Sequence, residues 1–322
     1  MSRIVVALGG NAILEGGEGT VEKQRRSIRK TIPKLIELRK QGHDLVLTHG
    51  NGPQVGQLLL QNEETDEVEP RPLDVLGAES QAQIGYLFQQ EFRNQTGTVP
   101  VTTITQTRVD ADDPAFDNPT KPVGPYYEED EIAEKDFEVA KVNKTANETA
   151  YRRVVPSPEP LEIVESDHIS QLVESGRTVI CTGGGGVPVV EEQGDYKGIE
   201  GVIDKDRASA VLADDVDADE FLVLTDVDAA YRNFGTEDEE RIDEVTPEEA
   251  RELLDDGVFG EGSMGPKVQA CIDFVEDGGD RAAITNPENA AEALAGEAGT
   301  TVVAPESKTE ELTQEDEPTI AQ

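Results

Sequence analysis

A glycine-rich turn joins a strand-like segment to a helix-like segment early in this sequence. In "LVLTHGNGPQVGQLLLQ", residues 45–61, the apolar run stops at Thr48 and His49, glycines follow, and a helical pattern starts at Pro53. Such a turn exposes backbone N–H groups that can bind an anion. The glycines read G-x-G-x-x-x-G, one residue longer than the dinucleotide fingerprint, and no G-x-x-x-x-G-K-[ST] occurs. A phosphate site and a purely structural turn both stay open for this segment.

Other glycine-rich turns follow apolar runs in the same way. They are Gly9-Gly10-Asn11 after residues 3–8 and the run from Gly183 to Gly186 after residues 177–182. In an open α/β sheet, ligands bind beyond the carboxyl ends of the strands. Glycine turns that meet at one sheet edge would therefore offer many N–H groups to an anion. For the four-glycine run a flexible linker is the alternative, although apolar segments flank it closely.

Three lysines occupy positions where a cation is unexpected. Lys205 in "VIDKDRAS" and Lys267 in "GSMGPK" fall in the first turn of predicted helices, at the positive end of the helix dipole. Asp204 is ordinary there, because an acidic N-cap complements that dipole. Two such lysines after glycine-containing turns favour a shared anionic ligand, with solvated surface lysines as the alternative. Lys121 lies in a proline-stiffened segment and is weaker support by itself.

Metal-dependent and covalent chemistry have less support. Several aspartates could bind Mg²⁺, namely Asp204, Asp206, Asp226 and Asp228. Carboxylates are so frequent in this chain that their spacing says little. No G-x-S-x-G occurs, and Ser263 lacks that context. The motifs therefore indicate phosphoryl transfer, in which a protein mainly positions groups and neutralises charge.

The elements that must position these residues alternate along the chain. Strands are predicted at residues 3–10, 43–50, 99–106, 177–184, 220–228, 281–287 and 300–305. Helices are predicted at about residues 20–41, 53–63, 74–94, 205–214, 247–254, 265–277 and 287–295. The strands are rich in Val, Ile and Leu without clean alternation, as strands buried on both faces are. The pattern predicts an α/β fold with a mainly parallel sheet.

Two regions interrupt this alternation. Residues 110–160 contain prolines too dense for a sheet core, and we predict an inserted, protruding lobe there. Residues 306–322 form an acidic tail that we predict to be frayed.

Charge dominates the composition. The chain has 322 residues, with 68 acidic and 28 basic residues and a net charge of −40. No basic patch for nucleic acid is visible, and no segment approaches the roughly 20 apolar residues of a membrane span. Three histidines and two distant cysteines suit neither a metal site nor a disulfide framework. This cysteine usage suits a reducing cytoplasm, where we predict the protein to be. We also predict a folded, halophilic protein, because surface repulsion is screened at about 1 M salt.

The motifs, in this order, resemble the carbamate kinase group of the amino acid kinase family. The matching segments run from about residue 3 to about residue 304: "VVALGGNAI", "THGNGPQVGQLL", "AFDNPTKPVGP", "RRVVPSP", "GGGGVPVV", "VIDKDRAS", "LTDVD" and "GSMGPK". "NPTKPVGP" and "GSMGPK" separate this group from acetylglutamate and uridylate kinases. The resemblance implies reversible phosphoryl transfer from carbamoyl phosphate to Mg–ADP, giving ATP and carbamate, usually within arginine fermentation.

The resemblance also implies roles for site residues. The carbamoyl phosphate side would comprise Gly9, Gly10, Asn11, Gly50, Asn51 and Gly52. The catalytic set would comprise Lys121, Lys205, Asp206 and Lys267. Lys121 would reach down from the lobe, and Asp206 would hold these lysines in place. The nucleotide side would comprise Thr225, Asp226, Val227, Tyr231 and Met264.

The implied architecture is a three-layer αβα sandwich with a small protruding subdomain, usually a homodimer. Residues 1–219 would hold the carbamoyl phosphate side and residues 220–305 the nucleotide. Mg²⁺ would bind through the nucleotide phosphates rather than through protein ligands. Two alternatives remain: another amino acid kinase acting on a carboxylate such as N-acetylglutamate, and an inactive nucleotide-binding sensor. The intact set of lysines argues against the sensor.

Overall fold

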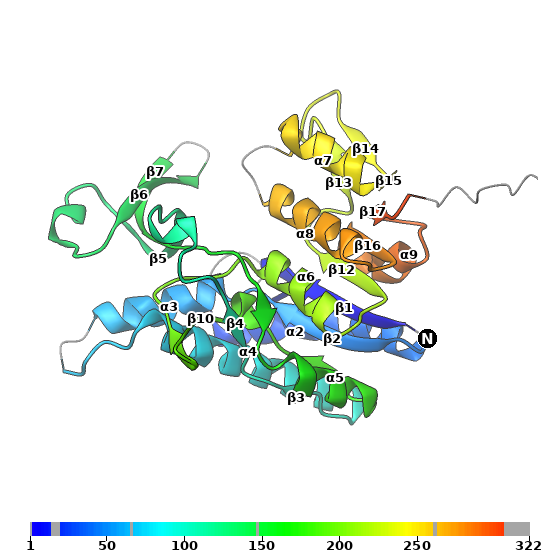
Figure 1. Ribbon diagram of the computed structural model, residues 1–322, viewed down its shortest axis with the longest axis horizontal. Coiled ribbons are helices and arrows are strands. Elements are labelled where there is room, and N and C mark those ends of the chain that lie inside the picture. Colours follow the sequence, from blue (N-terminus) through cyan, green and yellow to red (C-terminus); the bar gives the residue numbers. More distant parts are fainter. Residues whose placement is uncertain (1, 14–19, 65–66, 146–147, 260–262, 306–322) are drawn as a thin grey trace, which may run out of the picture.

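An eight-stranded sheet forms the centre of the molecule (Figure 1). The structure is a computed structural model, and it describes residues 2–13, 20–64, 67–145, 148–259 and 263–305. The strands are β1 (Arg3–Leu8), β2 (Asp44–His49), β3 (Val101–Thr102), β9 (Val179–Ile180), β12 (Glu220–Leu224), β15 (Glu244–Val245), β16 (Arg281–Thr285) and β17 (Thr300–Val303). Their order is β15-β17-β16-β12-β1-β2-β9-β3. Neighbours in this sheet run parallel, except that β16 and β17 are antiparallel.

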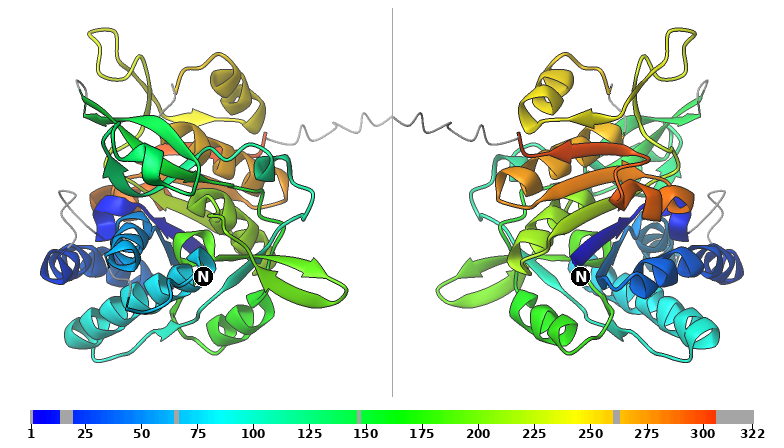
Figure 2. Two further views of the ribbon diagram at one scale, coloured as in Figure 1. Left: turned by 90° about the vertical axis from the view of Figure 1, so that its left-hand side faces the viewer. Right: turned by 90° about the vertical axis from the view of Figure 1, so that its right-hand side faces the viewer.

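Helices cover both faces of this sheet (Figure 2). One face carries α2 (Val21–Lys40), α4 (Leu73–Thr96) and α9 (Ala290–Leu294). The other carries α5 (Ser166–Glu174), α6 (Lys205–Asp215) and α8 (Met264–Glu276), with α7 (Pro247–Asp255) beside α8. Along β1, Val5 packs with the second set of helices and Val6 with the first. This double burial explains the unbroken apolar strands, and the predicted αβα sandwich is confirmed.

The smaller elements surround this core. A four-stranded sheet has the order β11-β10-β4-β8, formed by β4 (Gln106–Arg108), β8 (Glu162–Ile163), β10 (Val187–Glu192) and β11 (Asp195–Gly198). Short helices are α1 (Gly10–Ile13), η1 (Pro114–Phe116), η2 (Ile132–Glu134), η3 (Gly183–Gly185) and η4 (Pro287–Asn289), and α3 (Gly52–Glu63) follows β2. The sequence pattern did not predict α5, because this nine-residue helix buries only Ile169 and Val173.

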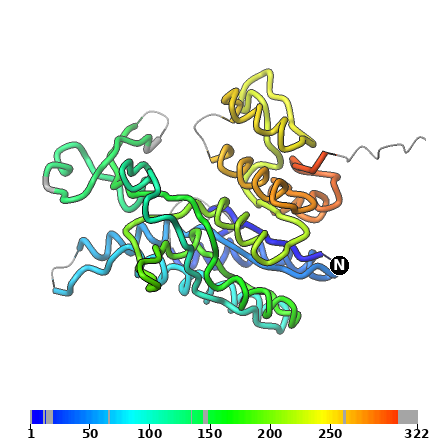
Figure 3. Tube along the Cα trace, viewed as in Figure 1, coloured from blue at the N-terminus to red at the C-terminus, as the bar shows by residue number. Residues whose placement is uncertain are grey.

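The proline-rich segment forms a small antiparallel sheet that protrudes from the body. Its strands are β5 (Lys121–Tyr127), β6 (Val139–Thr145) and β7 (Glu148–Val155), in the order β5-β7-β6. Pro122 and Pro125 lie on β5, an edge strand, where a missing N–H can face away from the ladder. Figure 3 shows this lobe standing apart from the hairpin of β13 (Ala230–Arg232) and β14 (Glu240–Ile242).

Two further predictions concern the C-terminal tail and membrane-spanning helices. The acidic tail, residues 306–322, lies outside the described residues. No described helix combines the length and the apolar content that a bilayer span requires.

Asp215, at the C-terminal end of α6, is a carboxylate whose burial should make protein stability depend on pH. Burial raises the pKa of Asp215 to about 6 from its ordinary 3.8, while its Oδ2 accepts a hydrogen bond from Ile163 N at 2.9 Å. Ionising this carboxyl is therefore unfavourable in the folded state, so its effect on stability becomes more unfavourable as pH rises from about 4 to about 6. Asp215→Asn keeps an acceptor for Ile163. We expect it to raise Tm by a few degrees near pH 7 and leave Tm unchanged near pH 4. Thermal unfolding of both proteins at the two pH values measures this, and an equal shift at both would contradict it.

Candidate active site

The glycine turns that follow β1 and β2 lie side by side at one edge of the sheet. Leu8 and His49 are paired in register, so Gly9 and Gly50 leave adjacent strands together. Gly9 N donates to Leu224 O at 2.8 Å, which places the first turn against the end of β12 as well. A Cβ on Gly9 would lie 2.8 Å from that same carbonyl oxygen, so only glycine fits there. The backbone turns predicted to bind an anion therefore converge, with Asn11 following in α1 and Gly52 starting α3.

The four-glycine run is a packed turn at the same edge. Thr182 and Gly184 both have positive φ, 49° and 66°, and Thr182 N donates to Thr105 Oγ1 at 2.7 Å. A Cβ on Gly183 would lie 2.4 Å from His49 Cε1. The run therefore packs directly on the end of β2, which disagrees with a flexible linker.

Two lysines share one buried aspartate beside these turns. Lys205 and Lys267 lie in the first turns of α6 and α8, which pack against each other. Lys205 Nζ is paired with Asp206 Oδ1, and Lys267 Nζ lies 3.5 Å from Asp206 Oδ2. Their side chains are 15%, 8% and 5% exposed for Lys205, Lys267 and Asp206. Two cations against one carboxylate leave a net positive charge, which is unfavourable in a buried position until an anion joins it.

The third lysine is held by a different aspartate. Lys121 Nζ lies 2.9 Å from Asp204 Oδ2, whereas Asp206 contacts only Lys205 and Lys267 among the three lysines. Asp204 is also the N-cap of α6, accepting from Asp206 N at 3.0 Å. Burial alone would raise the pKa of Asp204, but Lys121 and the hydrogen bonds hold it below the usual value. Sequence reasoning took Asp204 for an ordinary cap and missed this second contact.

Lys205 lies against the second glycine turn. Its Cδ would be 3.6 Å from a Cβ placed on Gly50. His49 is buried next to this turn, with Nδ1 2.9 Å from Gly50 O, and burial lowers the pKa of His49 to about 4. The imidazole is therefore neutral near pH 7, and Lys205 supplies the positive charge beside this turn.

The residues predicted for the nucleotide follow β12 and begin α8. Thr225 N donates to Thr285 O at 2.8 Å, and the Thr225 hydroxyl donates to Asp226 Oδ1 at 3.0 Å. Thr225 Cα would be 3.6 Å from a Cβ on Gly9, so this segment adjoins the first glycine turn. Tyr231 lies on the hairpin beyond, where its hydroxyl donates to Asp228 at 2.9 Å. Met264 packs on the apolar cluster of that hairpin and α7, three residues before Lys267.

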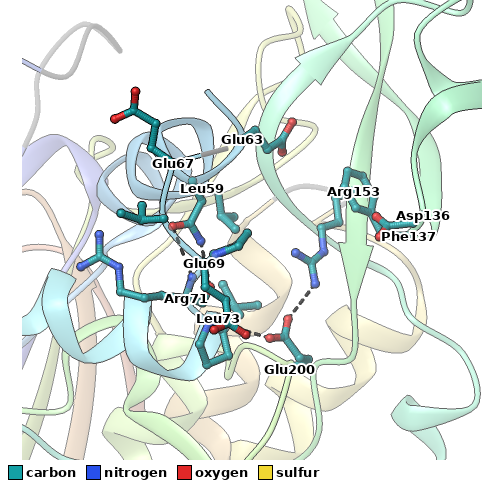
Figure 4. Close-up of a pocket in the computed structure, with 14 residues that line it drawn as sticks. Leu59, Glu63, Glu67, Glu69, Arg71, Leu73, Asp136, Phe137, Arg153 and Glu200 are labelled. Carbon is teal, nitrogen blue, oxygen red and sulfur yellow. Dashed lines mark hydrogen bonds and ion pairs between the residues drawn. The ribbon is translucent and has the colours of Figure 1, made fainter. Parts of the chain in front are cut away.

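A cleft of about 830 Å³ lies at the base of the lobe, and none of the predicted site residues lines it (Figure 4). Glu200 joins the lobe to the body here, accepting from Arg153 at 2.7 Å and from Leu73 N at 2.9 Å. Glu63 also lines the cleft, and its carboxylate accepts hydrogen bonds from Tyr127 at 2.5 Å and from Lys135 at 2.9 Å. These contacts fix the position of the lobe that carries Lys121, while the carboxylates make the cleft a poor place for phosphate.

Glycine turns and largely buried lysines that meet at one sheet edge are typical of a phosphotransferase of the amino acid kinase type. Residues 2–286 match the model of the amino acid kinase family, and the chain belongs to this family. Within it, the chain falls in the carbamate kinase group. It is 64% identical over 303 residues to the carbamate kinase of Halobacterium salinarum, covering 94% of this chain and 99% of that protein. It is 48% identical over 310 residues to that of Pyrococcus furiosus, with 94% and 99% covered. The solved structure of carbamate kinase from Giardia lamblia bound to AMP-PNP matches with a TM-score of 0.86 and 40% identity, covering 94% and 99%.

Proposed function

We propose that the protein transfers a phosphoryl group between carbamoyl phosphate and Mg–ADP, giving carbamate and ATP. The observation that carries this proposal is the pair of largely buried lysines on Asp206, next to the glycine turns. A β-phosphate oxygen of ADP attacks phosphorus, and the bond from phosphorus to the carbamate oxygen breaks. Charge shifts onto the leaving carbamate during this step, so fixed cations and N–H groups are the catalytic groups required.

Each residue at the sheet edge has a role in this proposal. Backbone N–H groups of the Gly9-Gly10-Asn11 and Gly50-Asn51-Gly52 turns bind carbamoyl phosphate. Lys205 and Lys267 neutralise the transferring group from two helices, and Asp206 orients both ammonium groups. Lys121 comes from the lobe and adds a third cation, and Asp204 positions it.

The nucleotide lies beyond β12 in this proposal, within residues 220–305. Thr225, Asp226 and Val227 line one side, and Tyr231 and Met264 line the other. Among the described residues, no group of three or more His, Cys, Asp and Glu side chains could hold a metal ion. Both oxygens of Asp206 already face lysines. In this proposal Mg²⁺ enters as part of Mg–ADP, held by the nucleotide phosphates.

ATP formation from ADP, Mg²⁺ and carbamoyl phosphate tests the proposed function. We expect rapid formation at about 1 M KCl and slower formation in dilute buffer, because the net charge of −40 repels anionic substrates unless salt screens it. N-acetylglutamate with ATP serves as the control substrate and should give no product. ADP binding without ATP formation from carbamoyl phosphate would contradict the proposal and favour a sensor. Phosphorylation of N-acetylglutamate would favour another member of the family.

A further inference from the structure

Asn51 does not do what its position in the chain predicts. It precedes α3 at the N-cap, where asparagine normally accepts a hydrogen bond from the first turn of the helix. Its side chain makes no such bond. Instead, Asn51 Nδ2 donates to Ser80 Oγ on α4 at 2.8 Å. Residues that break a local sequence rule, such as the capping rule here, often lie at functional sites.

Ser80 fixes which way the amide of Asn51 is turned. Ser80 is fully buried, and its hydroxyl donates to Gly77 O at 2.6 Å. A hydroxyl has one proton, and a carbonyl oxygen can only accept, so that proton is committed to Gly77. Ser80 Oγ must therefore accept from Asn51, which presents its NH₂ group to α4. The other polar atom of the amide, Asn51 Oδ1, makes no hydrogen bond with Ser80.

Gly184 packs against the same amide. A Cβ on Gly184 would lie 2.1 Å from both Cγ and Nδ2 of Asn51, and 2.2 Å from Oδ1. This close contact restricts rotation of the side chain. Among the described residues, Oδ1 accepts no hydrogen bond. Asn51 thus presents a fixed, unused acceptor in the turn that also contacts Lys205 through Gly50.

An acceptor next to a cationic site suits a ligand that carries both an anion and an N–H donor. We propose that Asn51 Oδ1 accepts a hydrogen bond from the amino group of carbamoyl phosphate, and that Ser80 is the positioning residue that orients it. This inference rests on the proposed function and adds the basis of substrate choice. Acetyl phosphate has the same shape but a methyl group in place of the amino group, so it leaves the acceptor unpaired. A buried polar group left unpaired is what lets a site reject such an analogue.

The test compares kcat/KM for ATP formation from carbamoyl phosphate and from acetyl phosphate, in the same KCl. Where turnover of acetyl phosphate is too slow, its inhibition constant replaces kcat/KM. We expect the wild type to prefer carbamoyl phosphate, and Ser80→Ala to lower that preference about tenfold by releasing the amide. The loss falls on carbamoyl phosphate, while acetyl phosphate changes less than about threefold. Asn51→Leu, which removes the acceptor and keeps the shape, should lower the preference in the same way.

The matched control is Ser27→Ala. Ser27 is another buried helical serine, its hydroxyl donating to Lys23 O at 3.2 Å, but it lies on α2. We expect its substrate preference to equal that of the wild type. If Ser80→Ala loses its cooperative thermal transition, Asn51→Leu decides the outcome. An equal loss on both substrates, or an unchanged preference in Asn51→Leu, would overturn the inference. The wild-type rate with carbamoyl phosphate reports separately on the proposed function.

Discussion

Replacing Lys205 by alanine is expected to lower kcat for ATP formation by about 10²- to 10³-fold, the usual effect of removing one charge-stabilising donor. Lys205 is 15% exposed, contacts the Gly50 turn and pairs with Asp206, so water cannot easily replace its ammonium group. The effect should appear in kcat, because the charge that Lys205 neutralises increases during transfer. Steady-state kinetics with saturating ADP and carbamoyl phosphate measure it.

The control for this variant is Lys197→Ala. Lys197 lies on β11, pairs with the exposed Glu192, and has a side chain that is 58% exposed. We expect it to keep kcat within about twofold of the wild type, since exposed ion pairs contribute little. Lys205→Ala leaves Asp206 paired with Lys267, so its Tm should stay near that of the wild type. A near-wild-type kcat in Lys205→Ala would remove Lys205 from the catalytic set.

The expected salt dependence and the largely buried lysines have one electrostatic explanation. At about 1 M KCl the Debye length is about 3 Å, so the long-range repulsion between the acidic surface and an anionic substrate is screened. Buried pairs are screened much less. The contacts of Lys205 and Lys267 with Asp206 therefore persist at high salt, while the barrier to substrate approach falls. A small number of buried cations can then serve a protein with a net charge of −40.

The sequence predicted the sheet and its glycine turns well, because these depend on local patterns. Apolar runs that end in glycine predict strands and their carboxyl ends, and parallel strands bring those ends to one edge. The unusual placement of Lys205 and Lys267 at helix starts also pointed to an anion site. These signals lie within short segments and need no knowledge of how the segments pack.

Contacts between distant segments could not be predicted in this way. The pairing of Lys121 with Asp204 depends on where the lobe sits. Glu63 and Glu200 fix that position through ion pairs with Lys135 and Arg153, which join segments far apart in the sequence. The contact of Asn51 with Ser80 opposes the local rule for an N-cap, so the pattern alone predicts the wrong partner. The dense prolines excluded residues 110–160 from the central sheet, but they did not reveal that β5 would form an edge strand, which tolerates proline where a central strand would not.

Replacing Asp206 by asparagine is expected to lower both stability and rate. The neutral amide leaves Lys205 and Lys267 without a shared counter-charge in a site where Asp206 is buried. Breaking a buried ion pair by removing one partner costs about 3–5 kcal/mol. The two ammonium groups should then move apart, and we expect kcat to fall at least about 10²-fold because a charge-stabilising donor is misplaced. Urea unfolding in constant KCl measures the free energy of unfolding, and steady-state kinetics measure kcat.

Asp214→Asn is the matched control, since it makes the same chemical change at the far end of α6. Burial, and then Asp277 and Asp217, raise the pKa of Asp214, so its charge is unfavourable in the folded state. Removing that charge should leave stability unchanged or higher, with kcat unaffected. The comparison with Lys205→Ala separates two roles for Asp206. If Asp206 orients the lysines, Asp206→Asn loses stability and rate together, whereas Lys205→Ala loses mainly rate. A variant Asp206→Asn that loses rate but keeps its free energy of unfolding would mean that Asp206 acts on the bound ligand instead.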